Sequence, residues 1–185
     1  MVDKVADVLR PTDEAFVHDL TALDLPEPVD AIASGAIFHW IHDHELLFRG
    51  LRSCLKEGGR LAAQCGGAAN IDDFRTVSGG VAAGEAYASH LVGLEEPWYY
   101  AGAEETEARL RDAGFGEVRC WLQPWEVIPP DPVEFMRTLI LAPHLDCLPE
   151  NLNDHFLADV LEATGEPLRR ATSASTSRPS RCGSP

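Results

Sequence analysis

The sequence predicts an α/β fold around a parallel sheet, and three consecutive segments carry this prediction. Val29–Ser34 is a short, mostly apolar run, as expected of a strand buried in a parallel sheet. The next segment has apolar residues at helical spacing, and Asp43 precedes it as a helix cap. We expect Lys56 in the last turn of this helix and Gly58-Gly59 at its end, since lysine suits the negative end of the helix dipole and glycine suits a helix end. Leu61–Cys65 then predicts a second buried strand, which completes a right-handed βαβ unit.

The carboxyl ends of these two strands are the expected place for a ligand, because parallel sheets bind ligands along that edge. The residues concerned are Ser34–His39 after the first strand and Gln64–Gly67 at the end of the second. The sequence therefore predicts a site built from these two segments.

The remaining elements follow from apolar periodicity and from Pro and Gly breaks. Helices are expected at Met1–Arg10, Asn70–Glu85, Glu104–Ala113, Asp131–Leu141 and Pro149–Glu162, and strands at Glu14–His18 and Phe115–Leu122. Gly79-Gly80 interrupts the second of these helices. Residues 166–185 are rich in Ser, Thr, Arg and Pro and offer little to bury. We therefore predict a domain over residues 1–165 and a disordered tail over 166–185.

Composition narrows the classes of function. The 185 residues suit one domain, and 45% apolar with 24% charged residues is ordinary for a globular protein. The formal net charge of −15 argues against nucleic acid and anionic membrane as partners. No apolar run is long enough for a membrane span, and no N-terminal segment resembles a signal peptide. The five cysteines are scattered without a CxxC pair, which favours reduced thiols and a cytoplasmic location.

One stretch of the chain resembles a known family. Asp30-Ala31-Ile32-x-Ser34 leads into Phe38-His39-Trp40-Ile41, and Leu55-Lys56-Glu57-Gly58-Gly59-Arg60-Leu61 follows. This pattern resembles the middle of a class I S-adenosylmethionine-dependent methyltransferase, of the small-molecule group that includes trans-aconitate methyltransferase. The resemblance runs from Met1 to about Gly165, and Glu57 departs from it where the family usually has Pro. It implies methyl transfer from S-adenosylmethionine to a small-molecule acceptor.

The resemblance also implies which residues bind the cofactor. In the family, an acidic residue after the third strand accepts a hydrogen bond from the adenine amino group, and Asp19, followed by Leu20, occupies that place. Ser34 and Gly35 lie where backbone groups meet the methionine end of the cofactor. The residues alone leave another interpretation of Asp19 open, that of a solvated turn or cap residue.

The expected substrate-binding residues are Phe38, His39, Trp40 and Trp98. His39 is the group best placed for acid–base catalysis, because it follows the central strand. Alternatives stay open: His39 can be a packed residue, and Trp40 a core residue. In relatives, the region of Asn70–Glu85 lies over the active site, so two interpretations stay open, part of a lid or, for most of its residues, a core-packing helix with a kink. Trp98 and the two tyrosines after it either line a pocket or fill the gap between this lid and the sheet.

The family's usual sheet has seven strands in the order 3-2-1-4-5-7-6, and the last strand in the chain runs antiparallel. If Val29–Ser34 is strand four, Glu14–His18 is strand three, and strands one and two have no counterpart. No E/DxGxGxG segment, the Gly-rich cofactor motif of strand one, occurs in the sequence. Strand seven also has no apolar counterpart after Glu166. We therefore expect an incomplete, N-terminally truncated Rossmann-like methyltransferase sheet whose open edges favour self-association.

Other functions compete with the enzyme. The main alternative is a catalytically inactive fragment or binding subunit of the same fold. A nicotinamide-dependent oxidoreductase is less favoured, because its Gly-rich fingerprint is equally absent. His39, His42 and His44 lack the spacing and the further ligands of a metal site, so no metal is expected. A hydrolase finds no support without a Gly-x-Ser-x-Gly elbow.

Overall fold

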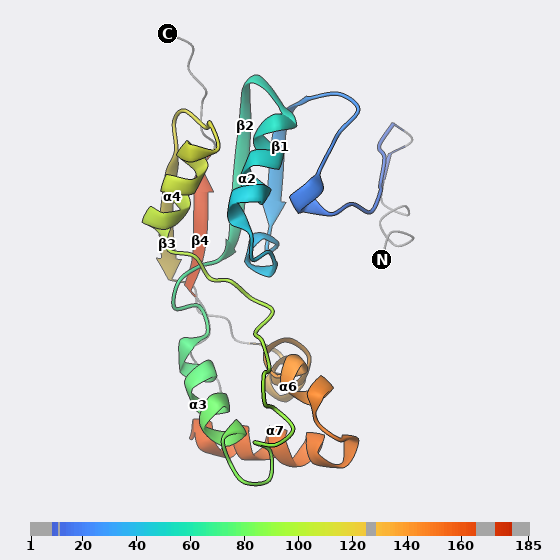
Figure 1. Ribbon diagram of the computed structural model, residues 1–185, viewed down its shortest axis with the longest axis vertical. Helices are drawn as coiled ribbons and strands as arrows, with labels where there is room; N and C mark the ends of the chain where they lie inside the picture. The colour runs from blue at the N-terminus through green and yellow to red at the C-terminus, as the bar shows by residue number, and fades with distance from the viewer. Residues whose placement is uncertain (1–8, 11, 125–128, 166–172, 179–185) are drawn as a thin grey trace.

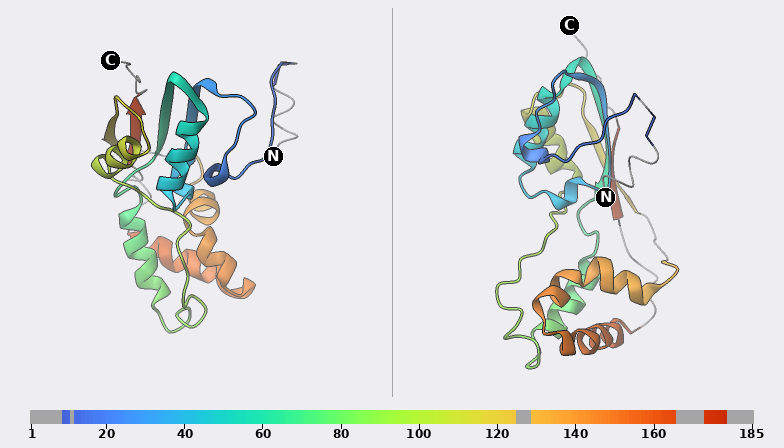
Figure 2. Two further views of the ribbon diagram at one scale, coloured as in Figure 1. Left: turned by 45° about the horizontal axis from the view of Figure 1, so that its top comes forward. Right: turned by 90° about the vertical axis from the view of Figure 1, so that its right-hand side faces the viewer.

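Residues 9–10, 12–124, 129–165 and 173–178 are those that the computed structural model describes. They form two lobes (Figure 1). The sheet lobe carries helices α2 (His44–Ser53) and α4 (Ala103–Asp112) on one face of its sheet (Figure 2). The helical lobe lies beyond the carboxyl ends of the two parallel strands (Figure 1). The predicted ligand-binding edge of the sheet therefore faces the helical lobe.

The sheet has four strands in the order β1-β2-β4-β3. The strands β1 and β2 run parallel, whereas β4 is antiparallel to both β2 and β3. The strands are β1 (Val29–Gly35), β2 (Leu55–Gly66), β3 (Arg119–Pro124) and β4 (Ser173–Arg178). The other helical elements are η1 (Leu20–Ala22), η2 (Phe38–Trp40), α3 (Asp72–Ala82), α5 (Pro132–Phe135), η3 (Met136–Ile140), α6 (Ala142–Cys147) and α7 (Glu150–Thr164). The predicted α/β class is confirmed.

The predicted βαβ unit forms from β1, α2 and β2. Asp43 caps α2, and its Oδ1 accepts a hydrogen bond from the Leu46 N–H at 2.9 Å. The inner face of α2 buries Leu47, Phe48 and Leu51 in the core of the sheet lobe, as the helical spacing predicts.

The junction between α2 and β2 differs from the prediction. The Val29 N–H donates to the Cys54 carbonyl at 2.8 Å, so the chain begins to pair with β1 as soon as the helix ends. Lys56 consequently lies in β2 and not in the last helical turn. Its Nζ is 3.0 Å from both carboxylate oxygens of Asp30 on the neighbouring strand.

Gly58 and Gly59 do not end the helix but lie within β2, where the register with β1 shifts. Gly58 has a φ of +72°, a conformation that favours glycine. A Cβ on Gly59 would lie 2.9 Å from the carbonyl oxygen of Lys56. The pair of glycines therefore permits a tight irregularity in the strand, which a helix-stop interpretation does not anticipate.

The prediction that the last strand is missing is wrong. Residues 173–178 form β4, which lies between β2 and β3 and pairs with both. These residues belong to the segment 166–185 for which a disordered tail is predicted. A strand with two neighbours is held by backbone hydrogen bonds on both edges, so it needs no apolar periodicity that a sequence pattern would reveal. The observed order corresponds to the 4-5-7-6 half of the seven-stranded arrangement.

The strand expected at Glu14–His18 does not form; this segment has no regular structure and its side chains are exposed. In the seven-stranded order, strand three pairs only with strand two, and the four strands of the described chain include no counterpart of strand two. A strand without a neighbour has no partners for its backbone groups. The helix expected at Met1–Arg10 falls largely outside the described residues.

The helical lobe has its own apolar core, formed mainly around the packing of α3 on α7. Its buried residues are Ile71, Phe74, Tyr87, Trp98, Met136, Ile140, Leu141, Leu145, Leu148, Phe156, Leu157 and Val160. The helix α3 runs through Gly79-Gly80 without the predicted interruption. The single helix expected over Asp131–Leu141 is instead α5 followed by the π-helical turn η3. No helix in the described part of the chain combines the length and apolar character needed to cross a bilayer.

Candidate functional site

The candidate site lies where β1 and β2 end. Ser34 and Gly35 close β1, and the Ala36 N–H donates to the Gln64 carbonyl of β2 at 2.7 Å. The Ser34 Oγ is buried without a hydrogen-bond partner among the described residues. A Cβ added to Gly35 would meet nothing within 4 Å. This edge therefore combines an unused hydroxyl with a backbone that a ligand can approach closely.

His39 is fixed at this edge by a hydrogen bond to β2. Its Nδ1 lies 3.1 Å from the Gly66 N–H, and an N–H can only donate, so Nδ1 accepts. Burial, with a smaller effect of His44, lowers the pKa of His39 below its usual range. The lowered pKa favours the neutral imidazole, and acceptance at Nδ1 leaves its proton on Nε2 as a hydrogen-bond donor.

Four rings form what we call the aromatic wall: His39, Trp40, Trp98 and Tyr100. His39 stacks on Tyr100 at a centroid distance of 5.6 Å, and Tyr100 stacks on Trp98 at 6.3 Å. Trp40 is tilted against Trp98 at 5.8 Å and is 49% exposed. These ring contacts join the end of β1 to the connection that leaves the helical lobe. Figure 1 shows this connection running from the helical lobe to α4.

Gly66, the last residue of β2, lies against the ring of Tyr100 in the aromatic wall. A Cβ at this position would lie 2.6 Å from the Cε1 atom of Tyr100. The ring of Tyr100 therefore rests directly on the backbone at the end of β2. Gly66 lies in the predicted Gln64–Gly67 end of the strand, and Tyr100 is one of the two tyrosines for which the sequence leaves a pocket-lining role open.

Phe38 does not belong to the aromatic wall. Its ring is buried in the core of the sheet lobe, edge-on to Phe48 at 5.7 Å. Its carbonyl accepts a hydrogen bond at 2.9 Å from Nε2 of His44, a buried histidine whose Nδ1 has no partner among the described residues. Phe38 thus fixes the turn that carries His39 and Trp40.

Asp19 and Leu20 pack beside α2 through η1. The Asp19 Oδ1 accepts hydrogen bonds from the Thr21 N–H at 2.9 Å and from the Thr21 hydroxyl at 2.8 Å. These bonds lower the pKa of the exposed Asp19 carboxyl. The cap interpretation of Asp19 therefore describes these contacts, both of which use Oδ1.

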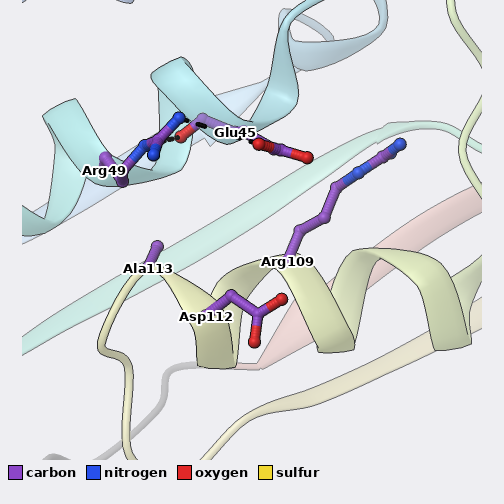
Figure 3. A pocket seen from close by; sticks show the side chains of 5 residues that line it. All are labelled: Glu45, Arg49, Arg109, Asp112 and Ala113. Carbon is purple, nitrogen blue, oxygen red and sulfur yellow. Dashed lines mark hydrogen bonds and ion pairs between the residues drawn. The ribbon is translucent and has the colours of Figure 1, made fainter.

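A cavity of about 100 Å³ lies between α2 and α4, lined by Glu45, Arg49, Arg109, Asp112 and Ala113 (Figure 3). Pockets that bury small organic ligands are usually about 300–1,000 Å³. Glu45 and Arg49 pair with each other on α2. The cavity is therefore too small for a nucleoside cofactor, and the aromatic wall is the better candidate site. No cluster of metal-ligating side chains occurs in the part of the chain that the structure describes.

Acid should destabilise the fold through its buried histidines. Burial lowers the pKa of His39, His44 and His144 below the ordinary value of 6.5. As pH falls below that value, these histidines bind protons in the unfolded chain while they stay neutral in the folded chain. The free energy of unfolding should therefore decrease from about pH 6.5 downward, measured by urea denaturation at a series of pH values.

His144→Phe provides the check on this prediction, because the phenyl ring keeps the stacking on Phe156 at 5.4 Å but does not titrate. This variant should show a shallower decrease in stability with acid than the wild type. An equal slope in the wild type and in His144→Phe would contradict the prediction.

Comparisons with known proteins agree with this geometry. A family model for a methyltransferase domain matches residues 1–63. The chain is 29% identical over 171 residues to trans-aconitate 2-methyltransferase of Azoarcus sp. (strain BH72), and the match covers 85% of this chain and 64% of that protein. The chain thus spans less than two thirds of the length of this relative.

Two solved structures show the fold. A chain of the Haloferax volcanii complex between the Trm112 methyltransferase activator and a methyltransferase matches with a TM-score of 0.52 and 17% identity, over 99% of this chain and 68% of that one. The YcgJ protein of Bacillus subtilis matches with a TM-score of 0.51 and 14% identity, over 90% of this chain and 70% of that one. At these identities the likeness concerns the fold alone.

Proposed function

We propose that this chain is a class I S-adenosylmethionine-dependent methyltransferase, and that it binds S-adenosylmethionine at the carboxyl edge of β1 and β2 for transfer of the methyl group to a small molecule. The sheet order β1-β2-β4-β3, with the aromatic wall at the ends of the parallel strands, is the observation that carries the proposal. When bound, the cofactor supplies a methyl group on a sulfonium, and the main task of the protein is to hold the acceptor in line with it.

The residues at the strand ends fit a cofactor in chemical terms. The buried Ser34 hydroxyl has unused hydrogen-bonding capacity, and Gly35 leaves its backbone open to a ligand. We propose Asp19 and Leu20 for the adenine end. Asp19 keeps one carboxylate oxygen free of the Thr21 bonds. These placements are the ones that the family resemblance implies.

For the acceptor we propose the aromatic wall as the binding surface. Trp40 offers exposed apolar ring area and is backed by the buried Trp98, and His39 offers its Nε2–H as a hydrogen-bond donor to an acceptor oxygen. Phe38 contributes indirectly to acceptor binding, because its carbonyl and ring hold the turn that carries His39 and Trp40. A net charge of −15 favours a small acceptor over a nucleic acid.

A second candidate is a binding subunit that holds no cofactor by itself. It is favoured by one observation, the absence of an E/DxGxGxG segment from the 185 residues. The outer edges of β1 and β3 in the described sheet would then offer backbone groups for self-association. Calorimetric titration with S-adenosylmethionine separates the candidates. Micromolar binding supports the enzyme, and no heat at millimolar cofactor supports the subunit.

Replacing Asp19 with Ala should weaken binding of S-adenosylmethionine by about 1–2 kcal/mol, the scale of a hydrogen bond to a charged group. Asp24→Ala removes a nearby exposed carboxylate and serves as the control for long-range charge. Calorimetry on both variants measures the difference. An unchanged dissociation constant in Asp19→Ala would remove Asp19 from the site.

A further inference from the structure

The connection at residues 97–101 crosses from the helical lobe to α4 (Figure 1). It contains Trp98 and Tyr100, two of the four rings of the aromatic wall. Trp98 is buried in the core of the helical lobe, and Tyr100 lies on Gly66 and stacks on His39. The two rings are stacked on each other at an interplanar angle of 19°. Tyr99, between them, makes a separate set of contacts with the sheet lobe.

Tyr99 is bound to the sheet lobe through both its backbone and its side chain. Its N–H donates to the His39 carbonyl at 2.8 Å. Its hydroxyl donates to Glu105 Oε1 at 2.7 Å and accepts from Arg109 Nη2 at 3.0 Å. The ring of His44 lies edge-on to it at 5.0 Å. Every polar group of Tyr99 named here has a partner of the correct donor or acceptor type.

Glu105 and Arg109 form a preorganised receptor for the phenol. They lie four residues apart on α4, and an ion pair of 2.8 Å joins them. The Arg109 guanidinium also lies over the Tyr99 ring at 5.2 Å. The hydrogen bond from Tyr99 is the main cause that lowers the pKa of Glu105, so the carboxylate is ionised at neutral pH and acts as an acceptor. Two side chains of α4 thus hold the phenol oxygen, one as hydrogen-bond acceptor and one as donor.

We propose that Tyr99, held by Glu105 and Arg109, is a positioning residue that sets the orientation of the aromatic wall through its neighbours Trp98 and Tyr100. Trp98 and Tyr100 flank Tyr99 in the chain and stack on each other, so a Tyr99 held by α4 fixes the rotation of the connection. Tyr100 is thereby presented to His39 and Gly66, and Trp98 to Trp40. The proposal deepens the proposed function, because it rests on the aromatic wall being the acceptor-binding surface.

Tyr99→Phe tests the proposal, because it removes the hydroxyl and keeps the ring. The readout is amide hydrogen exchange of the protein without cofactor, so the result stands even if S-adenosylmethionine does not bind. The Tyr99 amide bonded to His39, and the Gly66 amide beneath Tyr100, should exchange roughly threefold to tenfold faster, the equivalent of one lost hydrogen bond. Core amides such as those of Leu47 and Phe156 should exchange at the wild-type rate.

Glu105→Gln is the second variant, and Glu104→Gln is its matched control in the same first turn of α4. Glu105→Gln should accelerate exchange at Tyr99 and Gly66, whereas Glu104→Gln should not, since Glu104 makes no bond to the phenol. Exchange at Tyr99 and Gly66 that stays at the wild-type rate in both Tyr99→Phe and Glu105→Gln would overturn the proposal. An equal acceleration of all amides would overturn it too, because it would show a general loss of stability.

Discussion

Replacing Phe48 with Ala is expected to lower the free energy of unfolding by about 3–5 kcal/mol, the usual cost of removing a buried aromatic ring from a core. Phe48 is 1% exposed and packs against Phe38 at 5.7 Å and His44 at 5.3 Å. Loss of the ring leaves a cavity directly behind the turn that carries His39. Urea denaturation followed by circular dichroism measures the change.

The control for this substitution is Phe16→Ala, because Phe16 is 58% exposed. Its effect should stay within about 0.5 kcal/mol. The total stability of a domain is typically about 5–15 kcal/mol, so Phe48→Ala should also raise the unfolded fraction measurably. A loss below about 1 kcal/mol in Phe48→Ala would show that the sheet lobe is not packed as described.

Gly66→Ala is the second substitution with a large expected effect. The new Cβ would lie 2.6 Å from Cε1 and 2.9 Å from Cδ1 of Tyr100. That ring cannot move freely, because it is stacked between His39 and Trp98. We expect a loss of about 1–3 kcal/mol from overpacking, together with a changed near-ultraviolet circular dichroism spectrum.

Gly35→Ala is the matched control, since Gly35 also ends a parallel strand and a Cβ there meets nothing within 4 Å. Its stability should be unchanged or higher by up to about 1 kcal/mol, because alanine restricts the unfolded chain. Gly66→Ala with the stability and aromatic spectrum of the wild type would contradict the described contact between Gly66 and Tyr100.

The parts of the fold that could be predicted are those determined by local pattern. The apolar run at Val29–Ser34, the cap at Asp43 and the helical spacing after it identify β1, α2 and their crossover. The start of β2 cannot be predicted from the positions of the glycines. It is set by the hydrogen bond between the Val29 N–H and the Cys54 carbonyl, which joins segments far apart in the sequence. The strand β4 is not predicted from the sequence for the same reason. Its place is set by two neighbouring backbones and not by an apolar pattern.

The candidate site divides in the same way. His39, Trp40 and Trp98 were named from the sequence, and the structure brings their rings into one wall with Tyr100. Phe38 lies instead in the core. The sequence does not distinguish these two places, because an apolar residue beside a strand end suits a core as well as a binding site. The Tyr99 cluster of Tyr99, Glu105 and Arg109 was missed because its phenol meets α4 through tertiary contacts. The one available signal was a run of three aromatics just before a helix with Glu and Arg four residues apart.

The central claim is that the carboxyl edge of β1 and β2 forms the cofactor site of a methyltransferase fold. The most direct test is a titration of the ¹⁵N-labelled chain with S-adenosylhomocysteine, followed residue by residue in heteronuclear NMR spectra. We expect the largest shifts at the amides of Ser34, Gly35 and Gly66. No shift at millimolar ligand, or shifts confined to Arg49 and Ala113 at the cavity between α2 and α4, would contradict the claim.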